Sequence, residues 1–401
     1  MTRARAHGEV KTRLPTTVWT LGLVSLFMDA SSELIHGLLP VFLSVTLGAS
    51  MSVIGEIEGV AEAIAQFAKL ISGALSDRFG SRKPWLILGY GMSALTKPLF
   101  PLAGAIAPVA AARFLDRVGK GIRGAPRDAM LADVTPPAVR GAAYGLRQGL
   151  DTAGAIIGPL AASGLIILYA NNIRAALWWA VLPAALCVAT LVIFVREPEK
   201  RTVVKAERPS FRNAASLPFA FWIVTAMSGL MTLARFSDAF LILRGTSLGV
   251  PLTGAPLILV LMNVVYALSS YPAGAASDWA GRKALLMLGV MALMAADCAL
   301  ALAHGVIALG VGVAFWGLHM GLTQGLLSAM VADAAPAHLR GTAFGVFYAV
   351  SGIAVLAASA MAGALWDTLG APIPFAAGAA LAAVSLLLLP FVGPRRTRRR
   401  V

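Results

Sequence analysis

The chain alternates long apolar runs with short polar breaks, and the apolar runs are about the length of a membrane-spanning helix. A helix needs about 20 apolar residues to cross the hydrocarbon core of a bilayer. The pattern predicts an all-α membrane protein with twelve transmembrane helices. The expected ranges are 16–46, 51–77, 84–107, 108–134, 141–169, 173–195, 216–243, 252–277, 284–304, 306–333, 341–366 and 372–393.

One polar stretch, residues 196–215, is much longer than the other breaks. We interpret it as a cytoplasmic linker between an N-terminal six-helix bundle at 16–195 and a C-terminal six-helix bundle at 216–393. Residues 1–15 are then an N-terminal cytoplasmic tail. Residues 394–401 form a basic cytoplasmic tail.

Composition agrees with a membrane protein, because 58% of the residues are hydrophobic and only 13% are charged. Soluble domains carry about 25% charged residues. The net charge is +14, but the cations cluster in alternate breaks and at both ends of the chain. This is the positive-inside pattern. It places both termini in the cytoplasm of a multi-pass inner-membrane protein, makes the lipid bilayer a partner of the basic tail, and argues against nucleic-acid binding.

The remaining simple signals predict no resident cofactor and no enzyme activity. The first apolar run is too long for a signal peptide and contains Asp29, Glu33 and His36, so we expect it to be retained as helix 1. Cys187 and Cys298 lie far apart in apolar runs and form neither a disulfide framework nor a metal-ligand spacing. No phosphate-binding glycine-rich motif of the ATPase type occurs.

Two segments repeat at nearly one offset. GALSDRFGSRK at 73–83 returns as GAASDWAGRK at 274–283, and ADVTPPAVRGAAYG at 132–145 returns as ADAAPAHLRGTAFG at 332–345. A duplicated six-helix unit is typical of transporters whose halves rock about a site at the membrane midplane.

The first repeated segment resembles the signature between helices 2 and 3 of the major facilitator superfamily. The matching residues are Gly73, Leu75, Asp77, Arg78, Gly80, Arg82 and Lys83, and the second copy keeps Gly274, Asp278, Gly281, Arg282 and Lys283. In that family the motif acts as a conformational latch at the cytoplasmic side. The resemblance implies that Asp77 pairs with a helix N-terminus or with a basic neighbour such as Arg127 or Arg140.

A second resemblance, to superfamily antiporters, lies in helix 5. Gly145, Gly154, Gly158 and Pro159 have the spacing of the antiporter helix-5 motif, although its terminal glycine pair is Ala162–Ser163 here. Arg113 stands where drug/proton antiporters carry a helix-4 arginine. The resemblance covers essentially the whole chain. It implies alternating access, proton-coupled efflux of a small molecule, and a monomer.

The stretch 113–127 is the most unusual in the chain, because it is strongly charged and lies between apolar runs. On a helix its six charges fall within about 120° of arc, which lipid cannot accommodate, so the stripe should face the bundle interior. The stripe consists of Arg113, Asp116, Arg117, Lys120, Arg123 and Arg127. Helices 1 and 2 offer partners.

These charges divide into candidate roles. The candidates for proton coupling are Asp29, Glu33, Glu58 and Glu62. The candidates for the substrate cavity are His36, Arg113, Arg117, Lys120, Arg235 and His319. Intramembrane ionisable groups usually serve function, but static ion pairs that specify packing are the competing interpretation.

Three alternatives to efflux stay open at this level. An importer or facilitator of an organic anion would keep all features except the helix-5 motif. A divalent-metal exporter would bind its cargo through Asp29, Glu33 and His36, although our expectation is no metal site. A membrane sensor would need a signalling domain, which the sequence does not contain.

Overall fold

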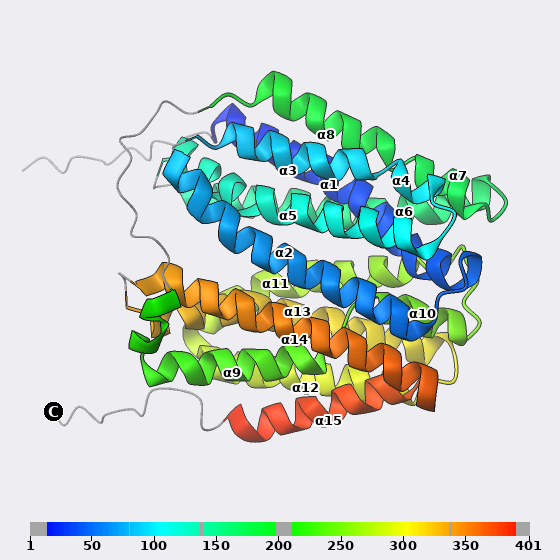
Figure 1. The fold of residues 1–401 in the computed structure, drawn as a ribbon. Helices are drawn as coiled ribbons and strands as arrows, with labels where there is room; N and C mark the ends of the chain where they lie inside the picture. The colour runs from blue at the N-terminus through cyan, green and yellow to red at the C-terminus, as the bar shows by residue number, and fades with distance from the viewer. Residues whose placement is uncertain (1–13, 80, 137–138, 198–210, 337–338, 390–401) are drawn as a thin grey trace, which may run out of the picture.

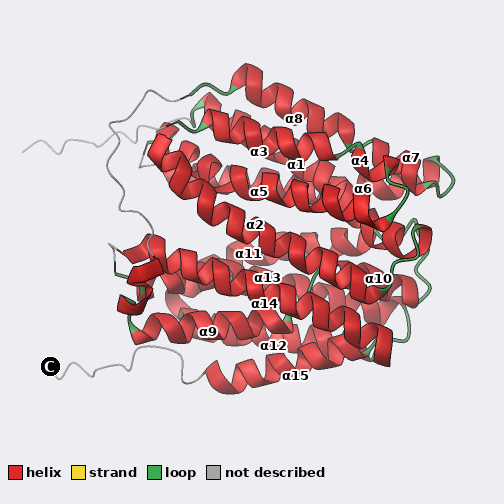
Figure 2. Ribbon diagram, in the orientation of Figure 1, coloured by secondary structure: helices red, strands yellow, loops and turns green. Residues whose placement is uncertain are grey.

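The computed structural model describes residues 14–79, 81–136, 139–197, 211–336 and 339–389. Within this part of the chain all regular structure is helical (Figure 2). The helices are α1 Thr16–Val41, the π-helix η1 Phe42–Thr46, α2 Met51–Phe79, α3 Lys83–Thr96, α4 Leu99–Leu102, α5 Ile106–Val134, α6 Arg140–Leu168, α7 Ile173–Trp178, α8 Val181–Phe194, the 3₁₀ helix η3 Phe211–Ser216, α9 Phe219–Ala234, α10 Ala239–Ser247, α11 Leu257–Ala280, α12 Arg282–Ala301, α13 Val306–Ala334, α14 Arg340–Leu369 and α15 Ile373–Leu388.

Taken in chain order, the described helices form twelve segments that run along the bundle, as predicted (Figure 1). Eight of these segments are long and apolar enough to cross a membrane by length and composition. The other four are the charged α2 and α5, the short pair α3 and α4, and the 16-residue α15.

Helices α1–α8 and α9–α15 lie in two layers, one above the other in Figure 1. In the first layer α1 packs on α6 and α8, and α5 packs on α2 and α3. In the second, α13 packs on α11 and α12, and α9 packs on α14 and α15. The layers meet where α2 lies along α14, α6 along α11, and α1 against α10. The predicted division into two bundles stays a prediction, because most of the linker at 196–215 and both predicted tails lie outside the described residues.

We call the end of the bundle where α1 begins and α15 ends the terminal end, and the opposite end the loop end (Figure 1). The layers touch closely at the loop end. Asp367 accepts hydrogen bonds there from the backbone N–H groups of Met51 and Ser52, at 3.0 and 2.7 Å, and from the Ser52 hydroxyl at 2.6 Å. The hydroxyl of Ser163 donates to the carbonyl of Thr253. These contacts close the loop end in this conformation.

Small residues let the charged helix α5 approach its neighbours. A Cβ at Gly119 would lie 2.6 Å from the carbonyl oxygen of Gly89 in α3. A Cβ at Gly121 would lie 2.4 Å from Ala68 and 2.7 Å from the carbonyl oxygen of Ala65 in α2. Glycine at helix contacts permits such backbone approach, and it fixes the register of α5 against α2 and α3.

Three segments that the pattern predicted as continuous are interrupted within the bundle. One is 173–195, where the short break at 179–180 separates α7 from α8. Pro98 separates α3 from α4, consistent with the missing N–H of proline. Between α9 and α10 the chain leaves the helix at Arg235–Asp238, where no proline occurs. The N–H of Ser237 donates to the hydroxyl of Ser359 in α14, at 3.2 Å, which replaces a lost helical bond. The break positions Arg235 and Asp238 toward the interior.

Candidate functional site

A cavity of about 470 Å³ lies between the two layers. All six predicted substrate-cavity residues line it, together with three of the four predicted proton-coupling acids. These residues are His36, Arg113, Arg117, Lys120, Arg235 and His319, with Glu33, Glu58 and Glu62. A second cavity of about 350 Å³ shares part of this lining and adds Asp29 and Arg127. The site therefore draws residues from both halves of the repeat.

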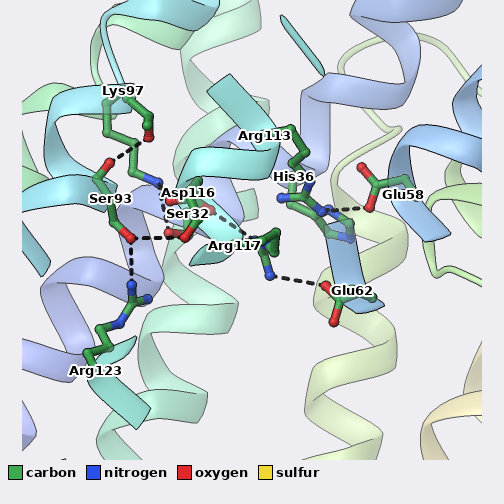
Figure 3. A network of polar contacts seen from close by, with 11 residues as sticks. Ser32, His36, Glu58, Glu62, Ser93, Lys97, Arg113, Asp116, Arg117 and Arg123 are labelled. Carbon is green, nitrogen blue, oxygen red and sulfur yellow. Dashed lines mark hydrogen bonds and ion pairs between the residues drawn. The ribbon is translucent and has the colours of Figure 1, made fainter. Parts of the chain in front are cut away.

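Arg113 pairs with an acid of α2 (Figure 3). Its Nη2 donates to Oε2 of Glu58 at 2.6 Å and to Nδ1 of His36 at 3.0 Å. Both charged side chains are buried, with exposed fractions of 2% for Arg113 and 1% for Glu58. The pair offsets the two buried charges, while Oε1 of Glu58 and Nε of Arg113 have no hydrogen-bond partner among the described residues.

Arg117 links the cavity to a second buried network (Figure 3). Its Nη1 donates to Oε1 of Glu62 at 3.1 Å, and its Nη2 lies 3.3 Å from Oδ2 of Asp116. Asp116 also accepts from Nζ of Lys97 at 2.8 Å, and Lys97 donates to the Ser32 hydroxyl at 2.9 Å. One network thus joins α1, α2, α3 and α5.

The cations nearer the terminal end also have polar partners. Arg123 donates to the Ser93 hydroxyl at 2.6 Å and lies 4.8 Å from the ring centre of Tyr90. Arg127 donates to the Ser25 hydroxyl at 3.1 Å and lies 3.7 Å from Oδ2 of Asp151. Four of the five cations in the stripe therefore have a polar partner within the bundle.

A smaller set of charges lines the cavities without an ion pair. Among the described residues, no hydrogen bond or ion pair joins the side chains of Asp29, Glu33, Lys120 or Arg235 to another group. Glu33 and Lys120 line both cavities. Groups with this freedom can bind a proton or a charged ligand without first breaking a partner.

The second half contributes fewer charges but defined hydrogen bonds. Nε1 of Trp316 donates to Oδ1 of Asp238 at 3.1 Å, and Nδ1 of His319 donates to the carbonyl of Gly289 at 2.8 Å. The bond from His319 fixes its tautomer and leaves Nε2 as the acceptor. Sequence reasoning missed Trp316 and Asn263, which lines both cavities and bonds to the Ala155 carbonyl. An apolar helix gives no signal for them.

The predicted latch motif is described only in part. Gly80 and the side chains of Asp77, Arg78 and Asp278 lie outside the described residues, and Gly73 falls within α2. Arg82 lies 3.6 Å from Asp133, and the equivalent Arg282 pairs with Asp333 in the second half. The N–H groups of Arg82 and Lys83 donate to Glu197, each at 2.6 Å, which caps the start of α3. Arg140 donates to the Thr135 carbonyl at 3.3 Å.

The helix-5 glycines approach α1. A Cβ at Gly154 would lie 2.6 Å from the carbonyl of Leu26, and one at Gly158 would lie 2.6 Å from the carbonyl of Ala30. Pro159 lies inside α6, and nothing lies within 4 Å of a Cβ built at Gly145. The motif therefore brings α6 against the helix that carries Asp29 and Glu33.

The side chains of His36, Asp29 and Glu33 do not converge. Within the part of the chain that the structure describes, no three His, Cys, Asp or Glu side chains are grouped so that they could hold a metal ion. His36 instead contacts Arg113.

Comparison with known proteins agrees with the fold. Residues 21–243 and 222–401 match the sequence model of the Major Facilitator Superfamily. The chain is 31% identical to an uncharacterised MFS-type transporter of Methanocaldococcus jannaschii, over 96% of this chain and 97% of that protein. It is 29% identical to the multidrug resistance protein MdtH of Proteus mirabilis, over 42% of this chain and 39% of that protein.

A solved structure of the nucleoside transporter NupG has the same fold, with a TM-score of 0.79 and 14% identity. The match covers 94% of this chain and 100% of that one. With its repeated helices and its cavity between the halves, the chain therefore belongs to the Major Facilitator Superfamily and is a membrane-spanning transporter.

Proposed function

We propose that this transporter exports a small molecule in exchange for protons, by alternating access. The observation that carries the proposal is that two of the cavity acids are paired with arginines and two are not. Glu58 and Glu62 pair with arginines, whereas Asp29 and Glu33 line the cavities without an ion pair. We therefore assign proton coupling to Asp29 and Glu33, and a positioning role to Glu58 and Glu62.

The chemistry of exchange follows from competition for one carboxylate. An acid in a water-poor cavity binds a proton readily, and a nearby cation opposes that binding. A substrate that brings a cationic group to Glu33 would displace the proton. Lys120, which lines both cavities beside Glu33, would bias the acid toward release when the helices move.

Two features support efflux over uptake. One is the partial match to MdtH, a protein named for multidrug resistance, in a chain that belongs to a transporter family. The other is the helix-5 motif, whose spacing resembles that of superfamily antiporters. Its glycines bring α6 against α1, the helix of the proposed proton acids.

A second candidate function, a facilitator for an organic anion, is favoured by one observation. Lys120 and Arg235 face the same cavity from opposite halves without ion-pair partners. An anion bound between them would join the two halves. The divalent-metal alternative gains no such support, because His36 contacts Arg113.

The remaining expectations belong to the same proposal. The protein would act as a monomer in the inner membrane with both termini in the cytoplasm. The latch of Asp77, with Arg127 or Arg140 as partner, would hold the terminal end closed in the opposite conformation. His36, Arg113, Arg117, Lys120, Arg235 and His319 would form the substrate cavity.

Proton release on ligand addition tests the assignment of function. Purified protein is mixed with cationic drugs, organic anions and divalent metals at several pH values, in weak buffer with a pH indicator. We expect proton release with one ligand class, and its loss in Asp29→Asn and Glu33→Gln. Glu56→Gln is the matched control, because Glu56 is exposed and lines neither cavity.

The outcomes separate the candidates. Binding of an organic anion without proton release, unchanged in both variants, would favour the facilitator and end the antiport proposal. Proton release that persists in Asp29→Asn and Glu33→Gln would move the coupling role to other acids.

A further inference from the structure

A carboxyl group outside both cavities has no visible partner. Asp297 lies in α12 with an exposed fraction of 0%, and neither of its carboxyl oxygens has a hydrogen-bond partner among the described residues. An ionised carboxylate in such surroundings is very costly unless a cation compensates it. The environment of Asp297 thus decides its charge.

Among the described residues, no Lys or Arg of the neighbouring helices faces this carboxyl. Helix α13, which packs on α12, carries His319 and Asp333, and His319 donates to the Gly289 carbonyl, about two turns of α12 away from Asp297. Helices α9 and α15 contain no charged residue, and α12 itself carries only Arg282 and Lys283, about 20 Å away along the helix. Arg244 contacts the end of α12, but its guanidinium donates to the backbone carbonyls of Leu300 and Ala303, at 3.0 and 2.9 Å. The carboxyl is left in apolar surroundings.

Two other helices meet at the same point. A Cβ at Gly378 of α15 would lie 2.6 Å from Oδ2 of Asp297 and 3.0 Å from the carbonyl oxygen of Ala234. Ala234 is the last residue of α9, and the carbonyls at a helix end lack intrahelical partners. A hydrogen-bond acceptor therefore lies beside the carboxyl, at the start of the break that places Arg235 in the cavity.

We propose that Asp297 is a proton-binding site in the second half and is neutral in this conformation. Its O–H is the hydrogen-bond donor for the open carbonyl end of α9. With Asp297 neutral, the end of α9 stays packed against α12 and α15. Arg235 and Asp238, which follow that end, are thereby positioned at the cavity. This site is separate from Asp29 and Glu33, and it does not depend on the direction or coupling proposed above.

Infrared spectroscopy of the purified full-length protein tests the charge state directly. We expect the protonated-carboxyl absorption at neutral pH to contain a component that shifts in D₂O and is lost in Asp297→Asn, whatever Asp29 and Glu33 contribute. Asp333→Asn is the matched control, because Asp333 is exposed and paired with Arg282. Identical acid bands in wild type and Asp297→Asn would overturn the proposal.

The positioning role has its own readout. With Cys187 and Cys298 replaced by alanine, a Ser237→Cys probe reports access to the break from the cavity through its rate of alkylation. We expect Asp297→Asn, which keeps size and a donor, to leave this rate unchanged, and Asp297→Leu to change it severalfold. An unchanged rate in a folded Asp297→Leu variant would remove the positioning role and leave only the spectroscopic claim.

Discussion

Two buried arginines of α5, Arg113 and Arg117, pair with acids. The pair of Arg113 and Glu58 is the clearest, with 2.6 Å between Nη2 and Oε2 and almost no exposure of either side chain. Removing one member of a buried pair leaves a charge that costs far more than the pair was worth. Stability at this position should therefore depend on both residues together.

We expect Glu58→Gln to destabilise the protein by about 3–5 kcal/mol, because Arg113 would then be buried without its acid. Thermal unfolding of the purified protein measures the effect. Replacing both residues, Glu58→Gln with Arg113→Met, should recover much of the loss. A Glu58→Gln variant as stable as Glu56→Gln would contradict this account.

The sequence predicted which charged residues would lie in the interior, but not which acid would pair with which base. Helical periodicity placed the stripe of α5 on one face, and Arg113, Asp116, Arg117 and Arg123 are indeed buried. Pairing depends on the relative register of α2 and α5, which the packing of Gly121 on Ala65 and Ala68 sets. Periodicity within one helix contains no information about that register.

At the scale of helices, α2 and α14 lie side by side across the two halves and are tied together at the loop end. Asp367 of α14 occupies the N-terminus of α2, where a side-chain acceptor satisfies N–H groups that the helix leaves open. At the same end, α6 of the first half meets the start of α11 of the second, where Ser163 donates to the Thr253 carbonyl. Both contacts must separate when the loop end opens.

We expect Asp367→Ala to weaken closure of the loop end by about 1 kcal/mol, roughly a fivefold change in the open-to-closed ratio. Spin labels at Ser50 and Leu252, in loops of opposite halves, would report it as a larger population at long distance. Thr368→Ala is the matched control, since the Thr368 hydroxyl bonds within its own helix at 2.7 Å. Equal distance distributions in Asp367→Ala and the control would exclude a gating role.

The break between α9 and α10 shows where prediction from the sequence stopped. Segment 216–243 reads as continuous because no proline or glycine marks Arg235–Asp238. The bond that supports the break comes from Ser359, more than a hundred residues away. A helix interruption that depends on a distant side chain has no local signature, whereas Pro98 between α3 and α4 does have one.

For the whole molecule, the distribution of charge between the two ends predicts orientation. The loop-end connections at 47–50, 103–105, 169–172, 248–256, 302–305 and 370–372 contain no Lys, Arg, Asp or Glu. Basic residues such as Arg82, Lys83 and Arg282 lie at the terminal end. Cytoplasmic loops carry the excess of Lys and Arg, so the terminal end should be cytoplasmic.

Cysteine labelling in intact cells checks this orientation. On a background with Cys187 and Cys298 replaced by alanine, His304→Cys at the loop end should react with a membrane-impermeant maleimide. Arg196→Cys at the terminal end should react only after lysis. The reverse pattern would place the terminal end outside the cell and contradict the predicted orientation.

The pairing of α5 also constrains how the chain is made. Helix α5 is not among the segments apolar enough to cross a membrane by composition, and each charge at the bilayer centre costs about 2.5–3.5 kcal/mol during insertion. Asp151, which lies near Arg127, follows α5, but the partners Glu58, Glu62, Ser93 and Lys97 all precede it in the chain. They have left the ribosome when α5 emerges, so α5 can enter the bilayer against helices already in place. The order of synthesis thereby provides α5 with polar partners that compensate for the low hydrophobicity of its own sequence.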